Sequence, residues 1–204
     1  MPECALAVQE VMDKAGVPAG LTATLLIDNR QVAGIIADPR IAAVTLTGST
    51  EVGAIVASQA GRALKKQVLE LGGSDPFIVL ADADLEAAAE TAVKARYINV
   101  GQSCVNAKRF IVEDTVADAF SALFCQKAAA LKIGDPMEPD VKIGPMAREN
   151  LRQTLHDQVE RSVAEGASLR LGGHLMNGPG AYYPPTVLDH VTPGMTAFVE
   201  ETFG

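Results

Sequence analysis

The sequence predicts an α/β fold, in which helices cover a largely parallel sheet. Helical and strand patterns alternate along the first third of the chain in a βαβαβ order, which is typical of a doubly wound unit. Continuous apolar runs such as residues 41–48 are typical of parallel strands covered on both faces. Aromatic residues make up only 4% of the 204 residues and Trp is absent, which favours tightly packed helices on a buried sheet over an antiparallel sandwich.

Residues 1–71 divide into alternating helical and strand periodicities. An apolar helical face in the first segment ends at Gly16, and Pro39 ends a second, shorter helix. The runs between the helices are rich in β-forming residues and predict strands. The predicted elements in chain order are helix 4–15, strand 21–28, helix 30–39, strand 41–48, helix 48–63 and strand 66–73.

Residues 72–204 continue the alternation after the Gly72–Gly73 pair, where we place the domain boundary. Asp84 is a typical N-cap for a long helix that runs towards Gly101. Three prolines within residues 132–145 predict a loop. The predicted elements are strand 75–82, the helix after Asp84, turn 101–108, strand 109–114, helix 116–131, loop 132–145, helix 148–166, turn-rich segment 172–185 and strand-like segments 186–191 and 196–201.

Charge and cysteine content exclude several classes of function. The formal net charge of −8 opposes a nucleic-acid or anionic-membrane surface, since both need clustered Lys and Arg. No apolar stretch approaches the roughly 20 residues that span a bilayer, and the acidic N-terminal segment differs from a signal peptide. Three irregularly spaced cysteines fit neither a disulfide framework nor a zinc site. We therefore expect a cytoplasmic protein without metal, nucleic-acid or membrane partners, with His156, His174 and His190 at its surface.

The strand-to-helix junction TLTGSTEVG is the first of three motifs that suggest chemistry. Free backbone N–H groups and the positive end of the helix dipole at Gly48 and Ser49 suit a pyrophosphate. Taken alone, the same residues equally fit a tight turn followed by an N-cap, so the motif by itself is weak.

The second motif, LELGG, places Glu70 in an apolar strand that ends in paired glycines. A carboxylate in such a place is either held neutral or poised as a base, because desolvation raises its pKa. The alternative is an ordinary charged residue at the end of a strand.

The third motif, GQSC, places Cys104 in an extended turn after Gly101. A cysteine reacts as its thiolate, so a catalytic one must be accessible and electrostatically assisted. The alternative is a buried, inert thiol, which is the common state of free cysteine. Cys4 and Cys125 are expected to belong to that inert class, since both lie within amphipathic helical patterns.

In their order and separation, these motifs resemble the aldehyde dehydrogenase superfamily. The matching segments are LTGSTEVG, LELGGSDPFIVLADADL, GQSCVNAKRFIV and EETFG, and the resemblance extends over essentially the whole chain. It is strongest for the succinate-semialdehyde dehydrogenase branch. The resemblance implies an aldehyde dehydrogenase-like fold, with residues 1–71 as part of a Rossmann-type NAD(P)-binding domain and 72–204 as most of an α/β catalytic domain.

The resemblance also implies a role for each matching residue. Cys104 looks like the nucleophile, and Glu70 like the base that activates the deacylating water. Glu201 resembles the residue that binds the nicotinamide ribose, and Phe203 the one beside the nicotinamide ring. The remaining predicted contacts to NAD or NADP are Gly48, Ser49, Thr50, Glu51, Val52, Gly53 and Leu71. The substrate would be a small aldehyde, and full-length relatives are homo-oligomers.

Members of this family are longer at both ends, so we expect an internal fragment with little or no dehydrogenase activity of its own. A non-catalytic remnant is one alternative, and a thiol acylating reductase is another. The reductases have no need of a deacylating base, so the intact LELGG motif favours the hydrolytic dehydrogenase. Lys108 and Arg109 lie close in sequence to the nucleophile, but strand alternation leaves their directions open, and neither is assigned a role.

Overall fold

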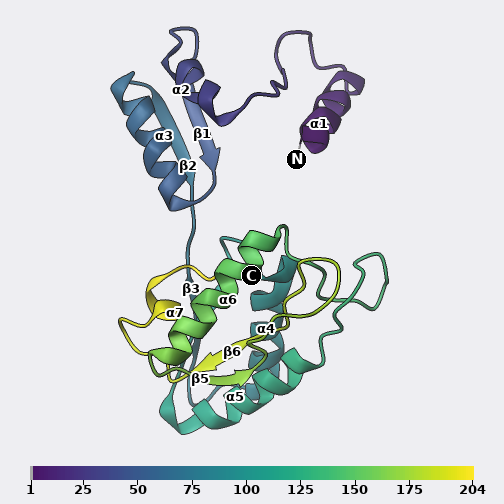
Figure 1. Ribbon diagram of the computed structural model, residues 1–204, viewed down its shortest axis with the longest axis vertical. Helices are drawn as coiled ribbons and strands as arrows, with labels where there is room; N and C mark the ends of the chain where they lie inside the picture. The colour runs from purple at the N-terminus through teal and green to yellow at the C-terminus, as the bar shows by residue number, and fades with distance from the viewer. Residues whose placement is uncertain (1) are drawn as a thin grey trace. The chain divides into compact units, whose positions relative to one another are not determined.

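The computed structural model describes residues 2–204, and the chain divides into two compact units, Met1–Leu71 and Gly72–Gly204. Both units combine helices with strands, which confirms the predicted α/β class (Figure 1). The division falls between Leu71 and Gly72. The cofactor-binding and catalytic roles assigned to the two parts remain predictions.

The first unit is built around two parallel strands joined by a crossover helix. Strand β1 pairs with β2 from Ala43 opposite Lys66 to Thr47 opposite Glu70, and α3 connects them. The buried hydrophobic cluster of this unit consists of Ile36 on α2 and of Val56 and Ala60 on α3. The elements in chain order are α1 (Pro2–Lys14), α2 (Asn29–Ala37), β1 (Ala43–Thr47), α3 (Thr50–Arg62) and β2 (Lys66–Glu70).

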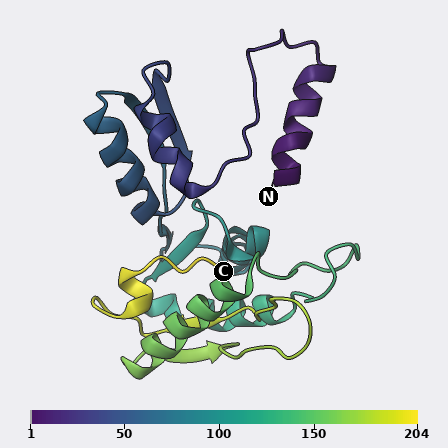
Figure 2. The ribbon, with the colours of Figure 1, turned by 45° about the horizontal axis from the view of Figure 1, so that its top comes forward.

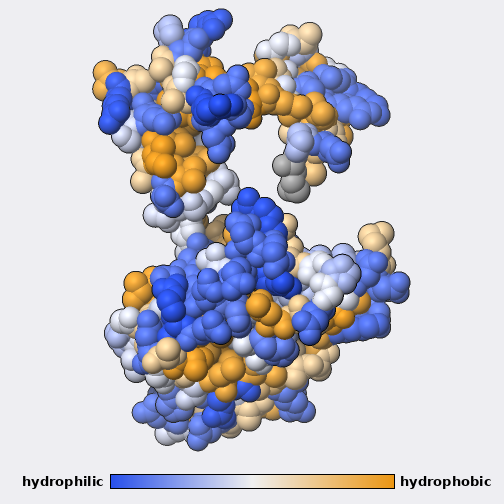
Figure 3. All heavy atoms as spheres, viewed as in Figure 1, coloured by the Kyte–Doolittle hydropathy of each residue, from blue (hydrophilic) through white to orange (hydrophobic). Residues whose placement is uncertain are grey.

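Two predictions for the first unit are wrong. Residues 21–28 form no strand, and Figure 2 shows an extended segment between α1 and α2. A strand needs a hydrogen-bonded neighbour, and no strand of residues 2–204 pairs with this segment, so Leu21 and Leu25 are exposed. Strand β1 is not covered on both faces, because its residues alternate between exposed and half-buried. Figure 3 shows further apolar side chains at the surface of this unit.

The second unit contains one parallel and one antiparallel strand pair. Strand β3 pairs with β4 in parallel, with Phe77 opposite Phe110, and β5 pairs with β6 in the antiparallel sense, with Leu169 opposite Leu188. The elements are β3 (Asp75–Val79), α4 (Leu85–Tyr97), the 3-10 helix η1 (Ile98–Gly101), β4 (Ala107–Val112), α5 (Asp114–Ala129), α6 (Glu149–Ala164), β5 (Ser168–Leu171), β6 (Val187–Asp189) and α7 (Thr196–Val199).

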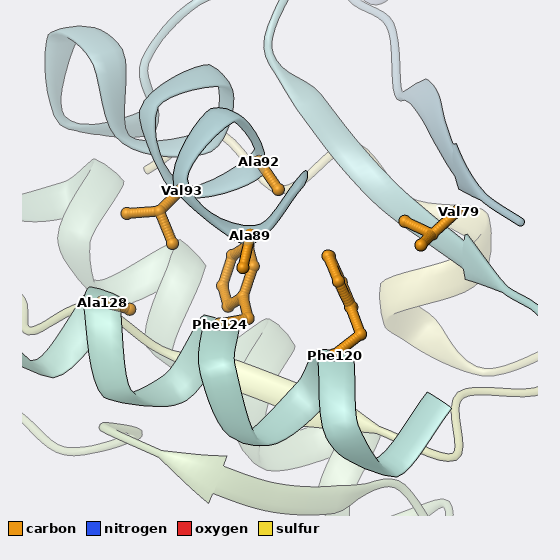
Figure 4. Packing of buried hydrophobic residues seen from close by; sticks show 7 residues of the cluster. All are labelled: Val79, Ala89, Ala92, Val93, Phe120, Phe124 and Ala128. Atoms are coloured by element: carbon orange, nitrogen blue, oxygen red, sulfur yellow. The ribbon is translucent and has the colours of Figure 1, made fainter. Parts of the chain in front are cut away.

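The core of the second unit lies where α4 and α5 pack against each other and against the β3–β4 sheet (Figure 4). The alanines on the buried face of α4 let the phenylalanines of α5 approach closely. The ring of Phe124 lies 4.9 Å from that of Phe110 and 6.0 Å from that of Phe120, measured between centroids. The fully buried members of this cluster are Val79, Ala89, Ala92, Val93, Phe120, Phe124 and Ala128.

Helix α4 begins at the predicted N-cap. The Asp84 side chain accepts hydrogen bonds from the backbone N–H groups of Glu86 and Ala87, both at 3.1 Å. We expect Asp84→Ala to lower the free energy of unfolding by about 1 kcal/mol, because two first-turn donors lose their acceptor. Urea denaturation measures this loss, and Asp118→Ala, at an exposed position within α5, serves as the control. Equal effects of the two substitutions would contradict the capping role.

The end of the chain departs from the predicted strands. Residues 196–201 begin with helix α7, and β5 has no counterpart among the predicted elements. The cause lies at the C-terminal end of α6: the C-cap residue Glu165 accepts the N–H and hydroxyl of Thr196, and the Ser162 hydroxyl accepts the N–H of Ala197 at 3.0 Å. These bonds start a helical turn that local β-propensity opposes. The other face of α6 is hydrophilic, as predicted and as Figure 3 shows.

Candidate active site

The loop that carries Cys104 begins with three consecutive residues in the left-handed backbone region. In η1, φ is 52° at Asn99, 58° at Val100 and 73° at Gly101. Glycine adopts this conformation at little steric cost, whereas a β-branched valine rarely does. The chain therefore turns sharply out of α4 immediately before the GQSC motif, and the surrounding contacts must hold that turn in place.

The side chain of Asn106 provides those contacts. Asn106 is 1% exposed, and its Nδ2 donates to the carbonyl oxygens of Arg96 at 2.9 Å and Ile98 at 3.2 Å. The Nδ2 of Asn99 adds a bond to the carbonyl oxygen of Gln102 at 2.8 Å. Carbonyl groups at a helix end need donors from outside the helix. Asn106 is thus a structural residue of the site that the motifs do not identify, although a lone amide at the start of an apolar strand is a usable signal.

Cys104 is half-buried in the second unit and lies close to Gly73. A Cβ built at Gly73 would stand 3.4 Å from the carbonyl oxygen of Cys104. The backbone N–H of Cys104 donates no hydrogen bond within residues 2–204, so this donor is available to a ligand. Cys104 is therefore neither fully buried nor fully exposed, and it lies on a loop whose backbone is fixed.

Glu70 is the last residue of β2 and belongs to the first unit. Its backbone carbonyl accepts the N–H of Gly48 at 3.0 Å, which joins the LELGG strand to the GSTEVG turn. Its side chain is exposed, which fits the alternative of an ordinary charged residue at the end of a strand and not a desolvated carboxylate. The physical reason is strand alternation: Leu69 packs against the buried cluster of α2 and α3, so Glu70 lies on the opposite, uncovered face of β2.

The GSTEVG segment forms the predicted junction between β1 and the N-terminus of α3. The hydroxyl of Ser49 caps the helix by accepting the N–H of Val52 at 3.3 Å. The earlier N–H groups of the first turn have no intrahelical acceptor, and the surface at Thr50 and Glu51 is exposed. A Cβ at Gly53 would stand 2.5 Å from Leu71, so this glycine permits close packing of α3 on the strand end. The junction offers amide donors that fit a phosphate group.

Glu201 and Lys108 form an ion pair in the second unit. Glu201 Oε1 lies 2.5 Å from Lys108 Nζ and accepts the N–H of Gly73 at 3.1 Å. The predicted residue Phe203 is nearby, with its ring centroid 5.5 Å from Lys108 Nζ. Strand alternation on β4 gives Lys108 and Arg109 opposite directions: Lys108 is buried, whereas Arg109 is exposed and donates to the carbonyl of Ser74.

The expectation of a buried thiol requires correction for Cys4, whereas Cys125 keeps its predicted inert character. Cys4 is exposed rather than buried, because α1 buries no residue in the described chain. Cys125 is half-buried, and this burial raises the pKa of its thiol. A raised pKa leaves less thiolate at neutral pH, so Cys125 is a poor nucleophile.

His156 is not a surface residue, in contrast to the exposed His174 and His190. Its side chain is 13% exposed, and its Nδ1 lies 3.0 Å from the hydroxyl of Tyr183. Burial raises the pKa of Tyr183 to about 12. Within residues 2–204, no group of three or more His, Cys, Asp or Glu side chains is placed to hold a metal ion, and no helix is long and apolar enough to cross a membrane.

Comparison with known proteins identifies close relatives along the whole chain. The model of the aldehyde dehydrogenase family matches residues 1–204. The chain is 58% identical over 201 residues to the NAD(P)+ succinate semialdehyde dehydrogenase Sad of Escherichia coli (strain K12), covering 98% of this chain and 44% of that protein. It is 49% identical over 204 residues to an NADP+ succinate-semialdehyde dehydrogenase of Mycolicibacterium paratuberculosis, covering 100% of this chain and 43% of that protein. The chain therefore spans less than half the length of these relatives.

Solved structures agree with the sequence relatives. The succinic semialdehyde dehydrogenase of Streptococcus pyogenes in complex with NADP+ superposes with a TM-score of 0.96 at 37% identity, covering 100% of this chain and 45% of that one. The structure of Gox0499 gives a TM-score of 0.96 at 44% identity, covering 100% and 44%. These likenesses confirm the fold that the motifs predict.

Proposed function

This chain belongs to the aldehyde dehydrogenase family, and from that premise we propose that it carries the nucleophile Cys104 and the base Glu70 of an enzyme that oxidises succinate semialdehyde to succinate with NAD or NADP. The observation that carries the proposal is the 58% identity to the E. coli succinate semialdehyde dehydrogenase over 201 residues. Because the chain covers only 44% of that relative, both the activity and the substrate belong to the proposal.

The chemistry begins at the thiolate of Cys104, which adds to the aldehyde carbonyl and forms a tetrahedral thiohemiacetal. As the oxyanion collapses back to a carbonyl, a hydride leaves the same carbon and a thioester remains on Sγ. Glu70 then takes a proton from water, which attacks the thioester. The carboxylic acid departs and the thiolate is regenerated.

The free backbone N–H of Cys104 supports this scheme, since the oxyanion needs a donor close to the attacked carbon. The fixed turn before Cys104 also supports the scheme, because the Cys104 N–H must already point at the carbonyl oxygen before negative charge develops on that oxygen. Asn106 is a positioning residue here: it holds the loop through the carbonyls of Arg96 and Ile98 and does not touch the substrate.

The cofactor residues fit the proposal in chemical type. The first-turn amides at Gly48 and Ser49 would bind a pyrophosphate, and Glu201 would accept hydrogen bonds from ribose hydroxyls. Bound NAD or NADP would supply the hydride acceptor. The remaining residues proposed to contact it are Thr50, Glu51, Val52, Gly53, Leu71 and Phe203.

The proposal is tested by NAD(P)H formation from succinate semialdehyde, using the protein as its gene encodes it, with any sequence that flanks these 204 residues. We expect turnover with at least one of the two cofactors. A folded protein that gives no turnover with either would contradict the activity and would favour a non-catalytic member of the family. The same assay on the 204-residue chain alone tests the predicted lack of activity, which turnover would disprove.

We expect Glu70→Gln to slow turnover by about a hundred- to ten-thousandfold, because a glutamine cannot take the proton of the attacking water. Acylation needs no such base, so a succinyl thioester is expected to accumulate on Cys104. Mass spectrometry of the quenched protein detects this adduct. Glu138→Gln, at an exposed loop position, is the matched control and should leave turnover unchanged.

Slow turnover of Glu70→Gln without any adduct would point to a block before acylation and would contradict the role of base. The same measurement separates the thiol acylating reductases, which hand the acyl group to another acceptor. Such an enzyme would keep its rate in Glu70→Gln, because its mechanism does not use a deacylating water.

A further inference from the structure

Lys108 is a buried charged side chain on the strand that follows the predicted nucleophile. Its side chain is 1% exposed, on strand β4 four residues after Cys104. Its Nζ donates to Glu201 Oε1 at 2.5 Å and to the carbonyl oxygen of Gly73 at 2.6 Å. A buried ammonium is costly unless it is fully paired, so these two bonds hold Lys108 in one place.

The bonds to Glu201 are divided unequally between its two carboxylate oxygens. Oε1 accepts both the ammonium of Lys108 and the N–H of Gly73. Oε2 accepts no hydrogen bond within the part of the chain that the structure describes, although the Glu201 side chain is only 28% exposed. A Cβ built at Gly72 would overlap Oε2, so the glycine pair leaves room for this oxygen.

The backbone of Glu201 is anchored independently of Lys108. Gln158 on α6 donates to the carbonyl oxygen of Glu201 at 3.1 Å. The neighbouring Glu200 is held by two bonds from Arg161, both 2.8 Å long. Helix α6 therefore fixes where the residue lies, and Lys108 fixes how its carboxylate is turned.

We propose that Lys108 is a positioning residue that saturates one oxygen of Glu201 and presents the other, Oε2, as a pre-oriented acceptor for the ribose hydroxyls of the cofactor. The role of Glu201 as the ribose contact rests on the proposed function, and Lys108 adds the device that orients it. A carboxylate held in one rotamer loses less conformational entropy on binding than a free one. The ammonium of Lys108 also donates to the carbonyl oxygen of Gly73, which lies close to Cys104, so it connects the Glu201 carboxylate to the surroundings of the predicted nucleophile.

The test compares Lys108→Met with Arg109→Met, in the protein as its gene encodes it. Both variants remove one cation from adjacent positions of β4. Arg109 is exposed, donates hydrogen bonds to the carbonyl of Ser74 and lies 5.7 Å from the ring centroid of Phe198, but it makes no hydrogen bond or ion pair with Glu201. Titrations of NADH and NADPH, followed by nicotinamide fluorescence, give the dissociation constants without turnover. We expect Lys108→Met to weaken binding by about ten- to a hundredfold, as for a lost charged hydrogen bond, and Arg109→Met by less than about twofold.

A double variant separates positioning from general stability. If Lys108 acts through Glu201, then Lys108→Met adds little to the loss already caused by Glu201→Gln. If Lys108 were purely structural, Lys108→Met would lower the unfolding midpoint both in the unsubstituted protein and in Glu201→Gln. Its effect on the dissociation constant of the cofactor would then be the same in both backgrounds. Multiplied losses in the double variant would therefore overturn the proposal.

A second arm needs no cofactor. Hydrogen exchange at the Gly73 amide, measured by mass spectrometry of short peptides around residue 73, should become about tenfold faster in Lys108→Met and stay unchanged in Arg109→Met. Unchanged exchange in both variants would overturn the role of Lys108, whatever the cofactor affinity. If the unsubstituted protein binds neither nucleotide, the ribose-facing role and the proposed function fail together. If the unsubstituted protein binds a nucleotide and Lys108→Met binds it with the same dissociation constant, only this inference is overturned.

Discussion

Replacing Cys104 with alanine is expected to lower NAD(P)H formation from succinate semialdehyde by about 10⁴- to 10⁶-fold, the effect of removing a catalytic nucleophile. No other cysteine can take over. Cys125 carries a thiol whose pKa is raised by burial, and Cys4 belongs to the first unit, on a helix outside all the motifs. Initial rates at saturating substrate measure the loss. Cofactor titration should show unchanged affinity, because the substitution removes only the reacting atom.

Cys125→Ala is the matched control for this experiment and should keep the full rate. Alkylation by iodoacetamide gives an independent readout, since modification of Cys104 should proceed in parallel with the loss of activity. Appreciable turnover by Cys104→Ala would refute the covalent mechanism. Loss of activity in Cys125→Ala without loss of structure would move the nucleophile to the other thiol.

The largest effect on stability is expected for Phe124→Ala. Phe124 is 4% exposed, and its ring lies within 4.9 to 6.2 Å of the rings of Phe110, Phe120 and Tyr97. Removing it leaves a cavity between α4, α5 and the β3–β4 sheet, which should lower the free energy of unfolding by about 3–5 kcal/mol. Urea denaturation measures the change.

The control for Phe124→Ala is Val163→Ala, at a 40% exposed position of α6, with an expected change within about 0.5 kcal/mol. A loss below about 1 kcal/mol for Phe124→Ala would show that the surrounding helices collapse into the space. We expect little collapse, because the buried residues that α4 contributes to this cluster are Ala89, Ala92 and Val93 (Figure 4), whose short side chains cannot extend into the space.

Sequence patterns predicted those elements whose signals are local. Helix α4 is an example, because Asp84 caps it and its apolar spacing continues to the end. The failures have non-local causes. Residues 21–28 carry strong β-propensity but lack a pairing partner among the described residues. Residues 196–201 begin with a helical turn because Ser162 of α6 and Glu165, the residue that follows α6, accept its first hydrogen bonds. A propensity scale contains neither fact.

The candidate site divides in the same way. Spacing of LELGG, GQSC and EETFG was sufficient to select Glu70, Cys104 and Glu201, because the motifs carry a family resemblance. Their surroundings were not predictable. The exposure of Glu70 depends on which face of β2 the helices cover, and the contact of Lys108 with Glu201 joins residues 93 positions apart.

The ion pair between Lys108 and Glu201 also has a consequence for the order of events during biosynthesis. Glu201 is translated 93 residues after Lys108 and 128 after Gly73, an interval of about 5–20 s for the shorter separation at ordinary ribosome speeds. Throughout that interval the ammonium of Lys108 lacks its counterion, so the nascent chain cannot close over it without burying an unpaired charge. The surroundings of Lys108 therefore form late in the synthesis of this part of the chain, because the segment around Glu201 can dock only after residues 109–200 have been translated.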